Sequence, residues 1–406
     1  MAACCAGAGR SCTLVTEATG WCSGARDEHA CHTSRTEGRP CVWTGARCAK
    51  GALFGGVLDD TLACPLPSVK LNTGQRMPML AFGTGMLPLH SLERRLKQLR
   101  RRRSRSALPM LNTSLALGIT HIDTSEVYPD FDALGAALRP HRGRLFITSK
   151  VDPTTRSAAT RCAHDGGGCD AAMLYAANTT VRRLSLVPDL LLLHRPPAIR
   201  GGASDERTGS VQCTQLRAAW RGLEAAQRVG LTRAIGLSNV CGHLLRCLAT
   251  TVRVRPAVLQ YMHHVGMGID PFGYRTFGRR HWAAEYMAYS VLGGAELDFD
   301  RIVRSPTVVS VAAAHGTQPA DVAVAWVVQQ RIPLVVTSAK PAHLRANIRA
   351  FADEPPSGLL TASEMKALSS LQEPAGRPSH WGSCTDASVE AEADVTWRDR
   401  TPVELR

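Results

Sequence analysis

The stretch HIDTSEVY, residues 121–128, marks a point where an apolar strand gives way to a loop, with Asp123 and Tyr128 five residues apart. Two further apolar runs end in polar residues: LFITSK ends at Lys150, and PDLLLLH ends at His194. The carboxyl ends of the strands of a parallel barrel gather on one face, where active sites lie. The sequence therefore predicts a carboxylate, a phenol, an ammonium and an imidazole on one face. This set suits proton donation to a carbonyl oxygen.

Short apolar runs alternate with helical patterns along most of the chain. The predicted strands, besides the one before Asp123, cover residues 145–149, 189–193, 234–237, 258–261, 286–289 and 333–336. Between two of them, residues 215–229 place Leu216, Trp220, Leu223 and Ala226 on one helix face. This alternation favours a parallel sheet covered by helices. Since a (β/α)8 barrel takes about 250 residues or more, the 406-residue chain has room for one barrel and an extension.

The order of these motifs resembles that of the aldo-keto reductase family. The resemblance rests on segments between about residues 69 and 371, in family order: FGTG at 82–85, HIDTSEVY, FITSK, LLLLHRPP, GLTRAIGLSN at 230–239, LQYMHH, AYSVLGG and TSAKPAHLRAN at 337–347. It implies an α/β fold, a (β/α)8 TIM barrel whose lower end is plugged by a hairpin around residues 69–79. It also implies reduction of an aldehyde or ketone to an alcohol with a nicotinamide cofactor.

The four polar residues then receive chemical roles. A free tyrosine has a pKa of about 10, and a nearby cation lowers that value. Tyr128 would be the general acid, and Lys150 the cation that acidifies it. Asp123 would hold Lys150 by an ion pair, and His194 would bind the carbonyl oxygen. No residue in this scheme needs a metal ion.

No GxGxxG motif follows a first strand, so a dinucleotide-binding Rossmann module is not indicated. The cofactor contacts are instead those that the resemblance implies. Tyr289 matches the aromatic residue that stacks on the nicotinamide ring, and Ser238, Asn239 and Gln260 match the residues that bind its carboxamide. Thr84 is expected on the ribose side, and Asp123 is also expected to contact the cofactor. The remaining expected contacts are Ser290, Leu292 and Gly293 over the pyrophosphate, and Ser338, Lys340 and Asn347 at the adenosine phosphate.

Two departures from the family pattern bear on specificity. Thr337 and His343 stand where relatives often carry Lys and Arg, although Lys340 and Arg345 are near enough to supply charge. NADPH is the expected cofactor, and these departures put its preference over NADH in doubt, so NADH is left open. The residue after His194 is Arg195 rather than the frequent Trp. Arg195 either forms an ion pair or faces the pocket, where it would favour an anionic substrate.

Three segments are predicted: a Cys-rich extension at 1–65, the barrel at 66–375, and a tail at 376–406. Within the extension, Cys22, Cys31, Cys41 and Cys48 have spacings that suit disulfides. There are three alternatives: a metal site that includes His29 and His32, a flexible and partly reduced extension, or a start site that is wrongly assigned. Leu92, Leu96 and Leu99 recur at helical spacing and predict an amphipathic helix with an Arg-rich outer face. Eight basic residues of this segment supply more than half of the net charge of +14: Arg94, Arg95, Lys97, Arg100, Arg101, Arg102, Arg103 and Arg105.

This basic segment suits a nucleic acid or an acidic membrane surface, but a solvated helix face or a gene-model artefact is the simpler interpretation. No apolar run approaches the ~18 residues of a membrane span. We expect a monomer that acts on a small carbonyl compound and does not bind nucleic acid. We place it in the cytoplasm, with an organelle or a secretory lumen left open by the cysteines. The alternative function is a non-catalytic, nucleotide-binding barrel that regulates a partner. The sequence does not name the substrate.

Overall fold

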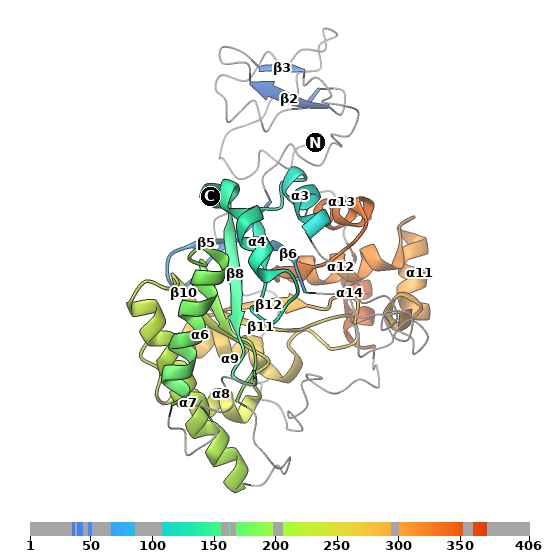
Figure 1. Cartoon of the computed structure of the whole chain (residues 1–406). Helices are drawn as coiled ribbons and strands as arrows, with labels where there is room; N and C mark the ends of the chain where they lie inside the picture. The colour runs from blue at the N-terminus through green and yellow to red at the C-terminus, as the bar shows by residue number, and fades with distance from the viewer. Residues whose placement is uncertain are drawn as a thin grey trace, which may run out of the picture.

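The computed structural model describes residues 66–85, 108–155, 162, 168–197, 206–293, 300–351 and 360–371, and three short strands between residues 35 and 50. Its main feature is a closed barrel of eight strands (Figure 1). In chain order these are β6 (Leu80–Gly83), β7 (His121–Asp123), β8 (Phe146–Val151), β9 (Leu190–Leu193), β10 (Ala234–Ser238), β11 (Val258–Met262), β12 (Glu285–Tyr289) and β13 (Leu334–Val336).

All eight neighbouring pairs in the barrel are parallel, and β13 pairs with β6 to close the ring, with Val336 opposite Phe82. The strands are almost entirely buried, as expected for a sheet that helices cover outside and side chains fill inside. The predicted (β/α)8 TIM barrel is confirmed.

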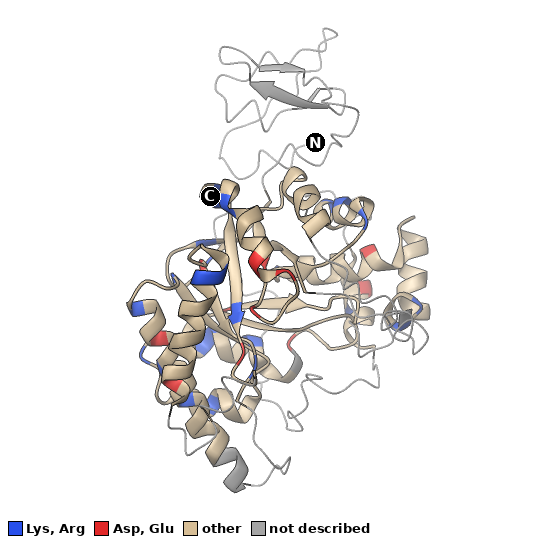
Figure 2. Cartoon of the chain, viewed as in Figure 1, with Lys and Arg blue, Asp and Glu red and all other residues tan. Residues whose placement is uncertain are grey.

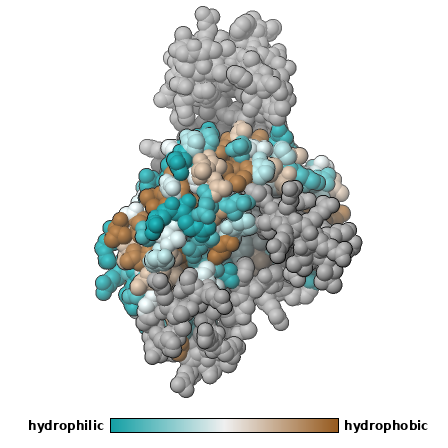
Figure 3. All heavy atoms as spheres, in the orientation of Figure 1, coloured by the Kyte–Doolittle hydropathy of each residue, from teal (hydrophilic) through white to brown (hydrophobic). Residues whose placement is uncertain are grey.

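Helices surround the barrel and connect its strands (Figure 1). Those of the ring are α3 (Leu108–Ala116), α4 (Phe131–Leu138), α6 (Cys169–Leu184), α7 (Glu206–Arg228), α8 (Gly242–Ala249), α9 (Tyr274–Trp282), α12 (Pro319–Gln329) and α13 (Pro341–Arg349). Shorter or additional pieces are η3 (Arg139–Arg144), η4 (Pro271–Gly273), α10 (Asp300–Val303), α11 (Pro306–Ala314) and α14 (Ala362–Ser369). Most described Lys and Arg positions lie on these helices and loops (Figure 2). The barrel face seen in Figure 3 mixes hydrophilic and hydrophobic residues.

Two strand boundaries differ from the sequence prediction. The apolar run before Asp123 starts at Gly118, but strand β7 begins only at His121, because Gly118 has a left-handed φ of 84° in the turn that follows α3. The amide of Ile119 then donates to the Ser114 carbonyl. This hydrogen bond caps the carboxyl end of α3. Strand β8 continues to Val151, so Lys150 lies inside the strand instead of ending it.

A two-stranded hairpin plugs the end of the barrel opposite the strands' carboxyl ends. Strands β4 (Ser68–Lys70) and β5 (Arg76–Pro78) are antiparallel. Leu71 and Met77 of the hairpin pack into one cluster with the side chains that fill the barrel interior, among them Phe146 and Met287. The Asn72 amide donates to the carbonyl oxygens of Pro256 and Trp282, at 2.8 and 2.9 Å. The plug and the interior therefore form one packed unit.

Cysteines of the barrel form disulfides that the sequence did not indicate. Cys162 is bonded to Cys169, and Cys213 on α7 is bonded to Cys247 on α8. In the extension, β1 (Arg35–Thr36), β2 (Arg39–Trp43) and β3 (Cys48–Lys50) form a small antiparallel sheet. Cys41 and Cys48 lie on β2 and β3, but the predicted pairing of the extension's cysteine side chains, the Arg-rich segment and the tail at 376–406 fall outside what the structure describes. Among the described helices, none has the length and apolar composition needed to cross a membrane.

Candidate active site

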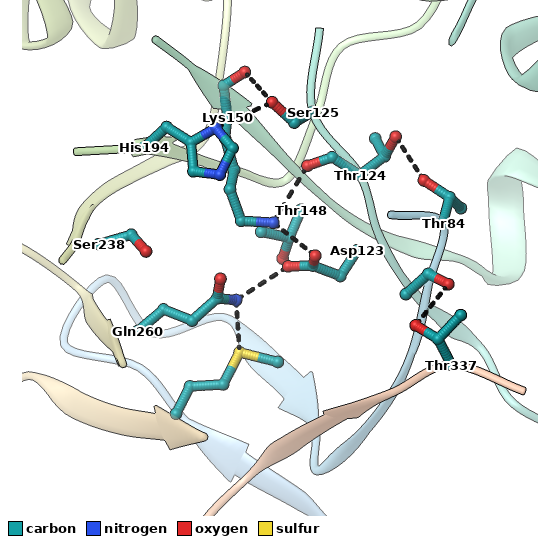
Figure 4. A network of polar contacts seen from close by, with 12 residues as sticks. Thr84, Asp123, Thr124, Ser125, Thr148, Lys150, His194, Ser238, Gln260 and Thr337 are labelled. Atoms are coloured by element: carbon teal, nitrogen blue, oxygen red, sulfur yellow. Dashed lines mark hydrogen bonds and ion pairs between the residues drawn. The ribbon is translucent and has the colours of Figure 1, made fainter. Parts of the chain in front are cut away.

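Four polar side chains meet where the barrel strands end. Asp123 is the last residue of β7, Lys150 lies in the adjacent β8, and His194 directly follows β9. Tyr128 lies in the loop after β7. The parallel register pairs Asp123 with Thr148, so Lys150 stands two residues further along and reaches back toward the carboxylate. The structure thus brings together the residues that the sequence singled out. Figure 4 shows three of them, Asp123, Lys150 and His194.

A buried ion pair lies at the centre of the site. The Lys150 ammonium donates to Oδ1 of Asp123 and to the Thr124 carbonyl, the latter at 3.2 Å. Oδ2 of Asp123 accepts from Nε2 of Gln260 at 2.8 Å. Burial lowers the pKa of Lys150, and the Asp123 carboxylate opposes that shift. Because each charged group here is paired and hydrogen-bonded, the burial of two charges is compensated.

The Tyr128 ring covers this ion pair. Nζ of Lys150 lies 5.4 Å from the centroid of the Tyr128 ring, and the His194 ring meets it edge-on with centroids 5.7 Å apart. Gly85 makes room for the phenol, because a Cβ at that position would lie 3.1 Å from Cε2 of Tyr128. The glycine at the turn after β6 is therefore a requirement of the tyrosine's placement.

An arginine from α6 holds the loop that carries Tyr128. The Arg183 guanidinium binds the Asp132 carboxylate at 2.7 and 3.2 Å, and donates to the Glu126 carbonyl at 3.1 Å. It also lies 4.9 Å from the centroid of the Phe131 ring. These contacts lie on both sides of Tyr128 in the sequence. They fix the loop at its two ends.

The expected acidification of Tyr128 by Lys150 is not what the structure gives. Burial of the phenol raises the pKa of Tyr128 well above its usual value, and the Asp123 carboxylate raises it further, while Arg195 opposes both. Burial is the largest cause, and the Asp123 carboxylate that raises the pKa further is paired with the Lys150 ammonium. In this state the Tyr128 hydroxyl stays protonated well above neutral pH.

His194 is neutral for related reasons. Burial lowers the pKa of His194 well below its usual value, and the positive charges of Lys150 and Arg195 lower it further. The carbonyl oxygen of His194 accepts from Nδ2 of Asn239 at 3.0 Å, which fixes the strand end. A neutral imidazole with one N–H can donate a hydrogen bond to an oxygen atom.

Arg195 forms an ion pair with a carboxylate that the sequence analysis did not single out. Nε of Arg195 lies 2.9 Å from Oδ2 of Asp152, which is buried just after β8. The guanidinium is partly exposed, with a side-chain exposure of 20%. Of the two interpretations of Arg195, the structure supports the ion pair. Asp152 directly follows strand β8, two residues after Lys150. The sequence analysis could have identified Asp152 from this position, because it is a polar residue at the end of a predicted strand.

The residues expected to bind a carboxamide converge at the same end of the barrel. Tyr289 donates to Oδ1 of Asn239 at 2.6 Å, and Nδ2 of Asn239 donates to Oγ of Ser238 at 3.1 Å. Asn239 has a left-handed φ of 58° and its amide is engaged on both sides. Within the described residues, the Gln260 amide oxygen accepts no hydrogen bond and the Ser238 hydroxyl donates none. One acceptor and one donor thus remain, which complement the NH2 and C=O of an amide.

The other expected cofactor contacts lie around the barrel mouth. Thr84 is buried after β6 and donates to Oγ1 of Thr124 at 2.8 Å. Ser290, Leu292 and Gly293 form the turn after β12, where Ser290 and Gly293 have positive φ. Ser338 binds the amide of Lys340 at 3.0 Å ahead of α13, and Asn347 lies on that helix. Lys340 is exposed, and Arg345 and Asn347 are half-buried.

The hydroxyl of Thr337, like those of Thr84 and Ser338, is engaged within the protein. Oγ1 of Thr337 donates to the Gly83 carbonyl at 3.0 Å (Figure 4). Among the described residues, no group of three or more His, Cys, Asp or Glu side chains is placed to hold a metal ion.

The aldo/keto reductase family model matches residues 79–373. The chain belongs to the aldo/keto reductase family. Among the family's curated members, aldo-keto reductase family 1 member A1 of Cricetulus griseus is 28% identical over 332 residues, covering 77% of this chain and 90% of that protein. NADPH-dependent codeinone reductase 1-2 of Papaver somniferum is also 28% identical, over 324 residues, with 76% and 90% covered.

Solved structures agree with this membership at the level of the fold. An aldo-keto reductase of Bombyx mori in complex with NADP has a TM-score of 0.57 at 21% identity, covering 76% of this chain and 93% of that one. The aldose reductase of Schistosoma japonicum has a TM-score of 0.56 at 23% identity, with 76% and 93% covered. Aldo/keto reductases carry out NAD(P)H-dependent carbonyl reduction, so the expectation of an oxidoreductase is confirmed.

Proposed function

We propose that this chain reduces an aldehyde or ketone to an alcohol with NADPH, and that Tyr128 is its general acid. The observation that carries the proposal is the buried Lys150–Asp123 pair beside two aromatic rings. The Tyr128 ring centroid lies 5.4 Å from Nζ of Lys150 and 5.7 Å from the His194 ring centroid. A codeinone reductase similar to this chain is NADPH-dependent, and a structural neighbour is in complex with NADP. These properties belong to those proteins and support the same cofactor here.

The four side chains divide the chemistry of reduction. When bound, the nicotinamide cofactor supplies the hydride that reaches the carbonyl carbon. The Tyr128 hydroxyl delivers a proton to the carbonyl oxygen, and the neutral His194 holds that oxygen by a hydrogen bond. The Lys150 ammonium stabilises the phenolate that proton transfer leaves behind. Asp123 holds the ammonium in place.

The barrel mouth fits a nicotinamide nucleotide. Ser238 and Gln260 offer the donor and the acceptor that a carboxamide needs, and the half-buried Tyr289 offers a ring face for stacking. Asn239 would join them only by giving up one of its present partners, so we assign it to positioning Tyr289 and the His194 strand end.

The cofactor's outer part would lie along two other segments of the mouth. We assign Thr84, Ser290, Leu292 and Gly293 to the ribose and pyrophosphate. We assign Ser338, Lys340 and Asn347, with Arg345 near them, to the 2′-phosphate. The exposed Lys340 at the start of α13 is the residue best placed to give this group a positive charge.

A turnover assay of the purified chain tests the proposal. NADPH oxidation is followed at saturating cofactor with a generic aromatic aldehyde, and the alcohol product is identified by mass spectrometry. Stoichiometric alcohol formation supports the reductase. Tight NADPH binding without turnover, across aliphatic and aromatic aldehydes and ketones, would contradict it and would favour a non-catalytic nucleotide-binding barrel.

A further inference from the structure

Ser125 contacts the imidazole that the proposed reaction uses. Oγ of Ser125 lies 3.2 Å from Nδ1 of His194, and both side chains are buried. The same hydroxyl lies 3.4 Å from the Lys150 carbonyl and 3.5 Å from the Val127 amide. In Figure 4 the second ring nitrogen of His194 points away from Ser125. The contact therefore involves only one of the two nitrogens of the ring.

Which nitrogen of His194 carries the proton decides what the ring can do. Burial and the charges of Lys150 and Arg195 keep the imidazole neutral, because they lower its pKa. A neutral imidazole has one N–H donor and one acceptor nitrogen. If the proton sits on Nδ1, then Nε2 is an acceptor and repels a carbonyl oxygen. If it sits on Nε2, the ring can donate to that oxygen.

A nearby carboxylate would by itself favour the unproductive form. Oδ2 of Asp152 lies 3.8 Å from Nδ1 of His194, a distance at which its charge attracts a proton to Nδ1 without a hydrogen bond. Its attraction is offset by Arg195, which binds the same oxygen at 2.9 Å. Oδ1 of Asp152 accepts from the amide and the hydroxyl of Thr154, at 2.8 and 2.6 Å.

The Ser125 hydroxyl has two acceptors within reach of its own proton, the Lys150 carbonyl and Nδ1 of His194. The Val127 amide donates to Oγ, which leaves the serine's own proton for another acceptor. The Lys150 carbonyl is the longer contact and already accepts from the Glu126 amide. Nδ1 of His194 is closer.

We propose that Ser125 is a positioning residue for carbonyl reduction: its hydroxyl donates to Nδ1 of His194 and thereby holds the ring proton on Nε2, facing the substrate oxygen. The proposal rests on the proposed role of His194 in catalysis. Ser125 itself does not touch the reacting atoms.

Nitrogen-15 NMR of the histidine-labelled full chain reads the tautomer directly, and the His194→Asn variant assigns the signals. We expect wild-type His194 to show a protonated Nε2 and an unprotonated Nδ1. In Ser125→Ala, the protonated Nδ1 form should become populated. Turnover should fall roughly threefold to tenfold, the size of one lost neutral hydrogen bond, in kcat more than in KM.

Two further variants sharpen the result. Ser149→Ala removes a buried hydroxyl with no hydrogen bond in the described part of the chain, one residue from Lys150, and should leave tautomer and turnover unchanged. Ser125→Thr keeps a hydroxyl and should restore both.

The proposal is overturned by a wild-type spectrum with the proton on Nδ1, which also decides the matter if Ser125→Ala does not fold. It is equally overturned if Ser125→Ala keeps the wild-type tautomer. A chain that shows the expected tautomer but no turnover would instead contradict the proposed function.

Discussion

The hydroxyl of Tyr128 can be removed with little effect on the folded structure, and this makes it a sharp test. Within the described residues it forms no hydrogen bond, while its ring packs against Gly85 and the His194 ring. Tyr128→Phe should therefore leave the free energy of unfolding almost unchanged. Loss of a positioned general acid lowers turnover by roughly 10²- to 10⁴-fold, so we expect a drop in that range.

Tyr261 is the matched control, because its hydroxyl contributes to the stability of the fold and lies outside the proposed catalytic group. It is buried in the core and donates to the Val240 carbonyl at 2.6 Å. Tyr261→Phe leaves that buried carbonyl unpaired and should cost about 1–3 kcal/mol of stability, with turnover preserved. The two variants should thus show opposite patterns.

The measurements are steady-state NADPH oxidation with one aldehyde, NADPH affinity by fluorescence quenching, and urea denaturation of each variant. NADPH affinity should match the wild type in both. Near-normal turnover in Tyr128→Phe would refute the assignment of the general acid. A loss of stability in Tyr128→Phe comparable to that of Tyr261→Phe would show that the hydroxyl serves the fold instead.

Three other changes test the electrostatics. Lys150→Met leaves the Asp123 carboxylate uncompensated, so turnover should collapse and the pKa of Tyr128 should rise further. Because the phenol is active when protonated, the alkaline decline of any remaining activity should move to higher pH. An unmoved decline would refute the proposed role of Lys150. Thr337→Lys adds a cation beside the expected 2′-phosphate and should raise the NADPH-to-NADH affinity ratio about tenfold or more. Fluorescence titration of both cofactors measures this ratio. An unchanged ratio in the variant, or several-thousandfold discrimination in the native chain, contradicts the assignment of this segment to the 2′-phosphate. Burial raises the pKa of Glu126 from 4.5 to about 7, so stability that is full below pH 4.5 should be lost as pH rises to 7. Glu126→Gln should remove roughly 3 kcal/mol of that dependence in urea denaturation, and an equal slope in both proteins would show that Glu126 is not its source.

Several parts of the fold could be predicted from local pattern alone. The runs before His194 and around Gln260 are apolar, short and bounded by turns, and both are barrel strands. Polar residues at strand ends were informative because parallel strands bring those ends together. The same reasoning placed Asp123, Tyr128 and Lys150 in one site, where they lie.

What the sequence could not provide were interactions between residues far apart in the chain. The direction of the shift in the Tyr128 pKa depends on the burial of the phenol and on its distance from the Asp123 charge, and only the folded geometry determines both. The Arg195–Asp152 pair joins residues that follow two neighbouring strands, β8 and β9, and only the paired sheet brings them together. The disulfide of Cys213 joins cysteines 34 residues apart that belong to no spaced motif.

Ring closure between β6 and β13 places a demand on the protein's synthesis. The Thr337 hydroxyl that bonds the Gly83 carbonyl lies 254 residues later in the chain. At a translation rate of about 5–20 residues per second, roughly 13–50 s separate the appearance of the two partners on the ribosome. During that interval the first strand has an unpaired edge that bears Phe82, buried in the finished protein. Until β13 emerges, that edge is open to pairing with another molecule.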